Sequence, residues 1–193
     1  MRKIYLFFIG AVFFSSVTAL GQDTIKVMQY NLLNYGYYTS YCTYQNNSVD
    51  QKDIYLKQII DYVMPDIFTV CELGSLNSNT TRILNNVLNT NGRNYYQNAG
   101  YTNQAGSSIV NMLYFDSRKF GLKWQGIANS TLRDINVYTL YYKSDDLAVN
   151  PDTAFVTCVV AHLKAGSSSS DQQMRSTMVQ NALNYLKTKN ISN

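Results

Sequence analysis

Apolar residues in this sequence occur in two alternating patterns along the chain. Short continuous runs, such as residues 67–71 (IFTVC) and 155–160 (FVTCVV), are typical of buried strands. Longer segments carry apolar residues every three or four positions, as expected for helices with one buried face. These patterns predict strands at 25–31, 67–71, 108–116, 120–127, 135–143 and 154–162, and helices at 48–64, 80–92 and 170–187.

Local signals mark the ends of the predicted helices. Ser48 is a suitable cap for the first helix, which must end before Pro65. Gly92 is expected to close the second helix, which begins at Thr80 or Thr81. The positions expected on the buried faces are Ile54, Ile60 and Val63, then Ile83, Leu84, Val87 and Leu88, and finally Met174, Met178 and Leu186. Apolar strands that follow helices predict an α/β sandwich, in which helices cover a sheet.

The N-terminus has the pattern of a secretory signal peptide. Arg2 and Lys3 precede an apolar run at 4–14, and residues 19–21 (ALG) form a small-residue cleavage site. The run is shorter than the roughly 20 apolar residues that a spanning helix needs. We therefore expect residues 1–21 to be removed and the protein to be secreted or periplasmic, without stable membrane association. The alternative is an uncleaved membrane anchor.

Composition places the rest of the chain among ordinary globular domains. The 193 residues are 46% hydrophobic and 15% charged, which excludes intrinsic disorder and fits one domain. Cleavage after residue 21 would lower the formal net charge from +4 to +2, because the removed segment holds two basic and no acidic residues. This charge gives no electrostatic sign of nucleic-acid binding and does not exclude it.

The chain contains three cysteines, at positions 42, 71 and 158. An odd number leaves at least one thiol without a partner in this chain. Cys71 and Cys158 lie in apolar strands, so we expect buried thiols that pack as small hydrophobic side chains.

Three predicted strands each have, at the carboxyl end, a polar side chain that could take part in catalysis or metal binding. These residues are Asn31, Glu72 and His162. Ligands of open α/β sheets bind beyond the carboxyl ends of strands, so these side chains converge on one patch if the strands are neighbours. Each residue also has a simpler interpretation, as a solvated turn residue, a local hydrogen-bonding group or a structural histidine. Their joint placement favours a functional site.

This set of residues suits metal-assisted hydrolysis of phosphate esters. Glu72 offers a hard oxygen to Mg²⁺, which proteins hold through one or two carboxylates, water and substrate phosphate. Asn31 could orient the phosphate or serve as a second metal ligand, and Mn²⁺ or Ca²⁺ would suit the same oxygens. His162 could donate a hydrogen bond to the phosphate or a proton to the leaving oxygen.

The residues around these three positions resemble known motifs. Residues 27–33 (VMQYNLL) resemble the opening strand of the endonuclease/exonuclease/phosphatase superfamily, whose fold is that of DNase I. Residues 65–72 (PDIFTVCE) are similar to its second motif, whose glutamate binds the metal. Residues 159–164 (VVAHLK) resemble the strand whose histidine acts on the phosphate, and Arg133 resembles an arginine that contacts the scissile phosphate. The resemblance covers roughly residues 25–187.

The resemblance implies a DNase I-like four-layer α/β sandwich and a secreted, divalent-metal-dependent phosphodiester hydrolase, most similar to an endonuclease. Its substrate would be nucleic acid or another phosphodiester. One alternative is a phospholipid or small-phosphate phosphohydrolase of the same fold. Another is a non-catalytic module that binds ligands through the tyrosine-rich loop at 35–44.

The family's later motifs are missing from this sequence. They include a water-activating histidine, and His162 is the only histidine here. We therefore interpret residues 22–193 as the incomplete, N-terminal part of such a domain and expect this chain alone to be inactive. Residues 166–170 (GSSSS) lack the nucleophile-elbow pattern, which argues against a serine hydrolase.

Overall fold

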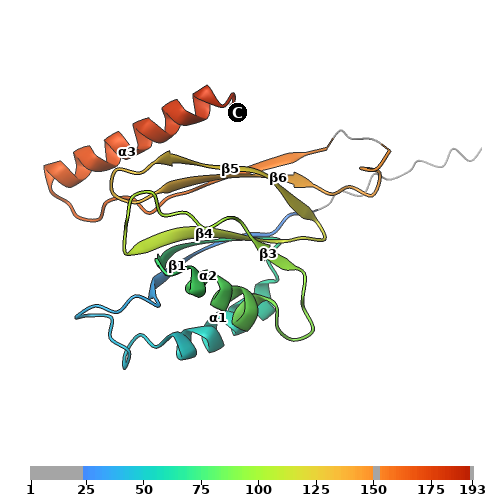
Figure 1. Cartoon of the computed structure of the whole chain (residues 1–193), viewed down its shortest axis with the longest axis horizontal. Helices are drawn as coiled ribbons and strands as arrows, with labels where there is room; N and C mark the ends of the chain where they lie inside the picture. Colours follow the sequence, from blue (N-terminus) through green and yellow to red (C-terminus); the bar gives the residue numbers. More distant parts are fainter. Residues whose placement is uncertain (1–23, 150–152, 192–193) are drawn as a thin grey trace, which may run out of the picture.

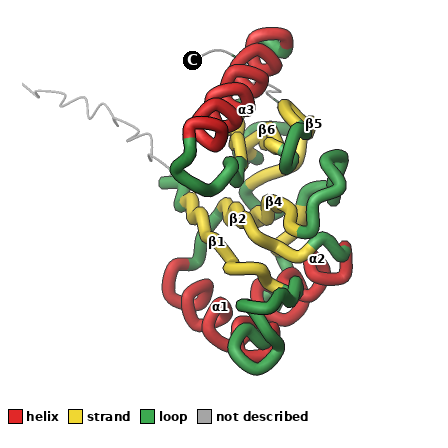
Figure 2. The backbone as a smooth tube through the Cα atoms, turned by 90° about the vertical axis from the view of Figure 1, so that its left-hand side faces the viewer, coloured by secondary structure: helices red, strands yellow, loops and turns green. Residues whose placement is uncertain are grey.

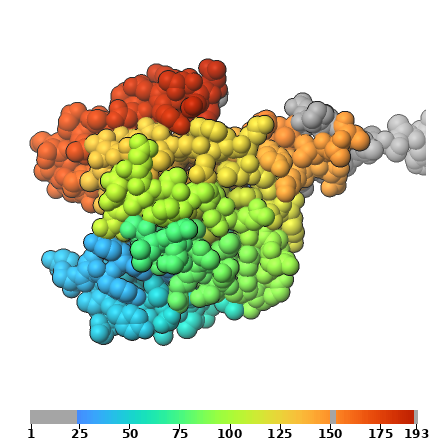
Figure 3. Space-filling model, viewed as in Figure 1, coloured from blue at the N-terminus to red at the C-terminus, as the bar shows by residue number. Residues whose placement is uncertain are grey.

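The computed structural model describes residues 24–149 and 153–191. The predicted signal peptide lies outside the described residues. Two β-sheets are stacked face to face, with α1 and α2 on the outer side of one sheet and α3 on the outer side of the other (Figures 1 and 2). This order of helix, sheet, sheet and helix confirms the predicted four-layer α/β arrangement. The space-filling view shows the two halves packed directly on each other (Figure 3).

The first sheet has the strand order β1-β2-β4-β3, and the second has the order β5-β6-β7. The strands are β1 (Val27–Tyr35), β2 (Ile67–Gly74), β3 (Tyr96–Asn98), β4 (Ile109–Asp116), β5 (Phe120–Asn129), β6 (Ile135–Tyr142) and β7 (Phe155–Val160). The helices are α1 (Val49–Val63), α2 (Asn77–Ile83), the π-helical turn η1 (Leu84–Leu88) and α3 (Ser169–Thr188). Among the strands of the described residues, β1 and β2 alone pair in parallel, and the other strand pairs are antiparallel.

The central strands β2 and β4 are buried on both faces, because helices cover one face and the second sheet covers the other. This explains why both strands are continuous apolar runs rather than alternating ones. The core between the layers includes Phe68 and Tyr114, whose rings stack 5.9 Å apart between centroids. A smaller cluster joins the second sheet to α3 through Val137 and Met178, both fully buried.

The helix predictions are confirmed in number and order, with local corrections. Ser48 occupies the predicted N-cap position of α1, but its side chain makes no capping hydrogen bond. The second helix begins at Asn77 rather than Thr80 and ends at Leu88, so Gly92 does not cap it. Instead, the π-helical turn ends the helix, and Gly92 adopts a positive φ of 80° in the turn beyond.

Two predictions of burial were wrong. Ile54 is 51% exposed, because Leu56 and Ile60 supply the buried face of α1. The strand at 155–160 is only partly buried, with Phe155 56% and Val159 45% exposed. It is the outer strand of its sheet, so its side chains lack a neighbour on one edge. The short strand β3 was not predicted.

All three cysteines, each within the described residues, are free thiols, and the predicted burial is confirmed for Cys71, whereas Cys158 is only partly buried. Cys71 is buried and Cys158 packs against the main core, and burial raises the pKa of both thiols. Among the described residues, no helix combines the length and the apolar character needed to cross a membrane.

Candidate active site

Asn31 on β1 and Glu72 on β2 form a direct hydrogen-bonded pair in the C-terminal halves of the two parallel strands. The Asn31 amide donates from Nδ2 to Glu72 Oε1 over 2.8 Å. The backbone N–H of Asn34 donates to the other carboxylate oxygen, Oε2, over 3.2 Å. Asn31 is itself fixed, because its Oδ1 accepts the N–H of Leu33 at 2.8 Å. The carboxylate is therefore held in one orientation from both of its oxygens.

The backbone around this carboxylate departs from regular strand geometry. The register with β1 shifts between Asn31 and Tyr35, and the register with β4 shifts between Val70 and Leu73, so Glu72 lies in a bulge against both neighbouring strands. Bulges redirect side chains and are common beside functional sites. Glu72 has a positive φ of 58°, a conformation that costs a non-glycine residue about 1–2 kcal/mol. Such strain persists where the surrounding structure enforces it.

The opposing bulge in β1 has its own support. Leu33 and Asn34 also have positive φ, of 48° and 57°. The ammonium group of Lys52, on α1, donates to the carbonyl oxygens of Leu32 and Leu33, both at 2.6 Å. This places the Asn34 N–H against Glu72. Burial lowers the pKa of Lys52, while the charge of nearby Glu72 opposes that shift.

His162 reaches the same point from the second sheet. Its Nε2 lies 3.3 Å from Glu72 Oε1, and its side chain is 21% exposed. Its Nδ1 is buried and has no hydrogen-bond partner among the described residues. Burial and the positive charge of Arg133 lower the pKa of His162, and the charge of Glu72 only partly offsets them. The imidazole is therefore neutral near pH 7, and the Glu72 carboxylate favours a proton on Nε2.

Arg133 lies in the connection between β5 and β6, next to His162. Its guanidinium donates from Nη1 to the carbonyl oxygen of Leu163 over 3.3 Å. Its positive charge contributes to the lowered pKa of His162, and it partly offsets the rise that burial causes in the pKa of Cys71. The structure thus joins Asn31, Glu72 and His162 directly and places Arg133 beside them through Leu163.

The donor set suits a hard divalent cation held mainly by water and substrate. Within the described residues, no group of three or more histidine, cysteine, aspartate or glutamate side chains could form a protein cage. Glu72 supplies one oriented carboxylate. Its Oε2 accepts one hydrogen bond and retains a lone pair, whereas Oε1 accepts from Asn31 and faces His162 Nε2. Asn31 Oδ1 also has one lone pair left. One carboxylate with one amide oxygen fits Mg²⁺, which keeps several waters and binds substrate phosphate.

Comparison with known proteins bears on the fold. No family model and no curated protein matches the sequence. Solved structures do match. One is a mannosyl-6-phosphatase from Bacteroides thetaiotaomicron, with 13% identity and a TM-score of 0.55, covering 84% of this chain and 60% of that chain. Another is an endonuclease/exonuclease/phosphatase family protein from the same organism, with 14% identity and a TM-score of 0.55, covering 84% of this chain and 58% of that chain. The human Nocturnin catalytic domain with bound sulfate also matches, with 16% identity and a TM-score of 0.53, covering 84% of this chain and 59% of that chain.

The chain has the DNase I-like fold. This confirms the fold that the sequence motifs predicted. The chain spans about 58–60% of the length of these DNase I-like structures.

Two contributors to the site of this DNase I-like chain were not predicted. The supporting ammonium group of Lys52 comes from a helix, where nothing in the local pattern separates it from a surface lysine. The Asn34 N–H is a backbone group, so no residue type could have indicated it. Arg175 on α3 has a structural role, because its Nη1 donates to the carbonyl oxygens of Lys164 and Gly166. It thereby holds the loop that follows His162.

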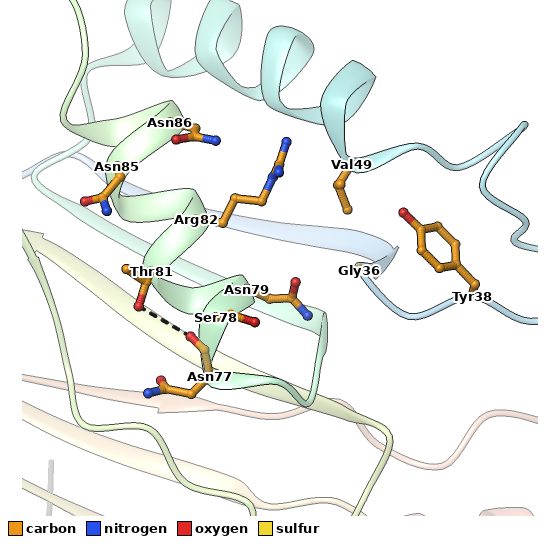
Figure 4. Close-up of a pocket in the computed structure, with 10 residues that line it drawn as sticks. All are labelled: Gly36, Tyr38, Val49, Asn77, Ser78, Asn79, Thr81, Arg82, Asn85 and Asn86. Carbon is orange, nitrogen blue, oxygen red and sulfur yellow. Dashed lines mark hydrogen bonds between the residues drawn. The ribbon is translucent and has the colours of Figure 1, made fainter.

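A separate open cleft of about 710 Å³ lies on the helical side of the first sheet (Figure 4). It is lined by α2, η1, the start of α1 and the loop after β1, and contains none of the four predicted site residues. Arg82 lies at its centre but pairs with Asp50 at 2.5 Å and Asp53 at 2.6 Å. The guanidinium is therefore neutralised within the protein.

Proposed function

We propose that this chain carries the metal- and phosphate-binding half of a divalent-metal-dependent phosphoester hydrolase. The supporting observation is that two side chains from different sheets converge on one carboxylate oxygen: Asn31 Nδ2 lies 2.8 Å and His162 Nε2 lies 3.3 Å from Glu72 Oε1. The described activity of the similar mannosyl-6-phosphatase supports phosphoester chemistry on this fold. Phosphodiesters, nucleic acid included, are the proposed substrates of a secreted enzyme, and small phosphate monoesters are the alternative.

Each residue has a distinct role in this proposal. Glu72 would hold Mg²⁺, or Mn²⁺ or Ca²⁺, with Asn31 orienting the carboxylate and offering its own amide oxygen. The bound ion would polarise the phosphoryl oxygens and neutralise developing charge. His162 directs Nε2 toward the same point, so that atom would donate its hydrogen to a phosphoryl or leaving oxygen.

Arg133 would add a fixed positive charge beside the phosphate. Its guanidinium cannot lose its proton in a protein, so it stabilises an anion at any working pH. It also keeps His162 neutral, which leaves Nε2 as a neutral hydrogen-bond donor. The two side chains would therefore bind the phosphate without competing for a proton.

Mn²⁺ binding to the 193-residue chain tests the central assignment. We expect binding detected by electron paramagnetic resonance, and a loss of affinity of at least about 10-fold in Glu72→Gln, which keeps the shape but removes the charge. Asp145→Asn is the matched control, because Asp145 is an exposed carboxylate far from β2 in the sequence. Equal Mn²⁺ affinity in the wild type and Glu72→Gln would remove this carboxylate from the metal site.

Turnover is a separate test. With Mg²⁺ and bis(p-nitrophenyl) phosphate, we expect no appreciable hydrolysis by this chain, because His162 is its only histidine and none is left to activate water. Substantial turnover that is lost in Glu72→Gln would support the metal site while refuting the expected need for a second histidine.

A further inference from the structure

Asn111 is a buried amide in the apolar layer between the two sheets. It lies on β4 of the first sheet and is 2% exposed. Its Nδ2 donates to the carbonyl oxygens of Asp134 at 2.7 Å and Val160 at 3.1 Å, and lies 3.2 Å from Asn136 Oδ1. All three acceptors belong to the second sheet or its immediate flank. A single amide group therefore crosses the layer and ties β4 to both β6 and β7.

The acceptors of Asn111 lie next to the predicted phosphate-binding residues. Asp134 directly follows Arg133, and Val160 is two residues before His162. The Asp134 carboxylate is also fixed, because it accepts the backbone N–H groups of Gln104 and Ala105 at 2.8 and 2.9 Å. The backbone at Arg133 and His162 is thus anchored close to each functional side chain.

On the other side, Asn111 is close to the metal-binding carboxylate. Its neighbour Val110 pairs in the β2–β4 register with Leu73, the residue after Glu72. The bulge that redirects Glu72 lies in this same stretch of the β2–β4 ladder. Asn111 therefore connects the backbone that carries Glu72 to the backbone that carries His162 and Arg133.

We propose that Asn111 is a positioning residue that sets the placement of His162 and Arg133 relative to Glu72. This inference rests on the proposed function. Burying an amide is unfavourable unless hydrogen bonds replace those it made with water. An apolar side chain of similar size would fill the same space without this requirement. The amide instead makes directional contacts that apolar packing cannot make, and these fix how one sheet sits on the other.

The test compares Asn111→Leu with Tyr138→Phe in the 193-residue chain. Both changes remove a buried polar group from the layer between the sheets, but the Tyr138 hydroxyl has no partner among the described residues. In Asn111→Leu we expect Mn²⁺ affinity to change by less than about 3-fold, since Glu72, Asn31 and the Asn34 N–H lie in the first sheet and Lys52 lies on α1, which packs on that sheet. Affinity for inorganic phosphate in Mg²⁺ should fall by about 10-fold, because small misplacements of binding groups are costly. Tyr138→Phe should leave both affinities unchanged.

A structural readout separates positioning from a general loss of stability. The single histidine of the chain gives one set of imidazole signals in a proton NMR spectrum. We expect cross-relaxation between the His162 ring and the Glu72 side chain in the wild type and in Tyr138→Phe, and its loss in folded Asn111→Leu. Unchanged cross-relaxation and phosphate affinity in Asn111→Leu would overturn the proposal.

If Asn111→Leu does not fold, Asn111→Thr provides the second variant, because its hydroxyl retains one donor. We expect it to show a smaller loss of phosphate affinity and weakened cross-relaxation; wild-type values for both would also overturn the proposal. Failure of the proposed function would look different. In that case Glu72→Gln would not change Mn²⁺ affinity, whereas the His162–Glu72 cross-relaxation would still report on Asn111.

Discussion

Replacing Tyr138 with phenylalanine should stabilise this protein. Tyr138 lies on β6, is 1% exposed and packs in the main core between the sheets. Its hydroxyl is buried and has no hydrogen-bond partner among the described residues. The same burial raises the pKa of the phenol well above its usual value. Tyr138→Phe removes only the unpaired hydroxyl and leaves the ring in place.

The magnitude follows from the cost of an unsatisfied polar group. A buried hydroxyl without a partner costs about 1–3 kcal/mol relative to water. Removing the hydroxyl relieves this cost, but the void left by one oxygen atom destabilises the protein by about 0.5–1 kcal/mol. We therefore expect a net stabilisation of about 0.5–2 kcal/mol. For a chain of this size, each kcal/mol shifts Tm by roughly 2–4 °C, so Tm should rise by roughly 1–8 °C.

Urea denaturation followed by circular dichroism measures this change, and Tyr114→Phe is the matched control. Tyr114 is equally buried on β4, but its hydroxyl donates to the carbonyl oxygen of Thr80 at 3.2 Å. Losing that bond should destabilise the protein by about 1 kcal/mol. A destabilised Tyr138→Phe would show that the hydroxyl has a partner, such as an internal water, and would refute the reasoning.

Three further predictions concern the site, its support and the ion pairs of Arg82. Burial and Arg133 lower the pKa of His162, so the unfolded chain takes up a proton more readily than the folded one. The free energy of unfolding should therefore decrease as pH falls below about 6.5. In Arg133→Gln the pKa of His162, measured by NMR titration, should rise toward its usual value; no rise would mean that Arg133 does not act on the imidazole. Arg82→Met should cost about 2–4 kcal/mol in urea denaturation, because it leaves the carboxylate of Asp53 buried without its cation. The double variant with Asp53→Asn should recover most of that loss, and a purely additive result would contradict the pairing. Lys52→Met should weaken Mn²⁺ binding by about 10-fold by releasing the two carbonyls of the β1 bulge, while Lys52→Arg retains most of the affinity.

The parts of the site that share one sheet could be predicted from the sequence. Asn31 and Glu72 each follow an apolar run, and parallel pairing of those runs brings their carboxyl ends to one edge. The pattern could not show that both strands continue past these residues or that each bulges there. Those features depend on positive φ angles at Leu33, Asn34 and Glu72, none of which is glycine. Only Asn34 is of a residue type that often adopts this conformation, and at Leu33 and Glu72 residue type gave no signal.

His162 lies at the predicted site, but not because its strand neighbours β1 and β2 in one sheet. The sequence argument assumed that its strand would neighbour the other two, yet β7 belongs to the second sheet. Convergence therefore depends on how one sheet is placed on the other, which no single-strand pattern encodes. Apolar packing alone would tolerate many such placements, whereas the Nδ2 bonds from Asn111 to the flanks of Arg133 and His162 select one. A buried amide within a largely apolar strand thus helps to determine how the two parts of the site are placed relative to each other.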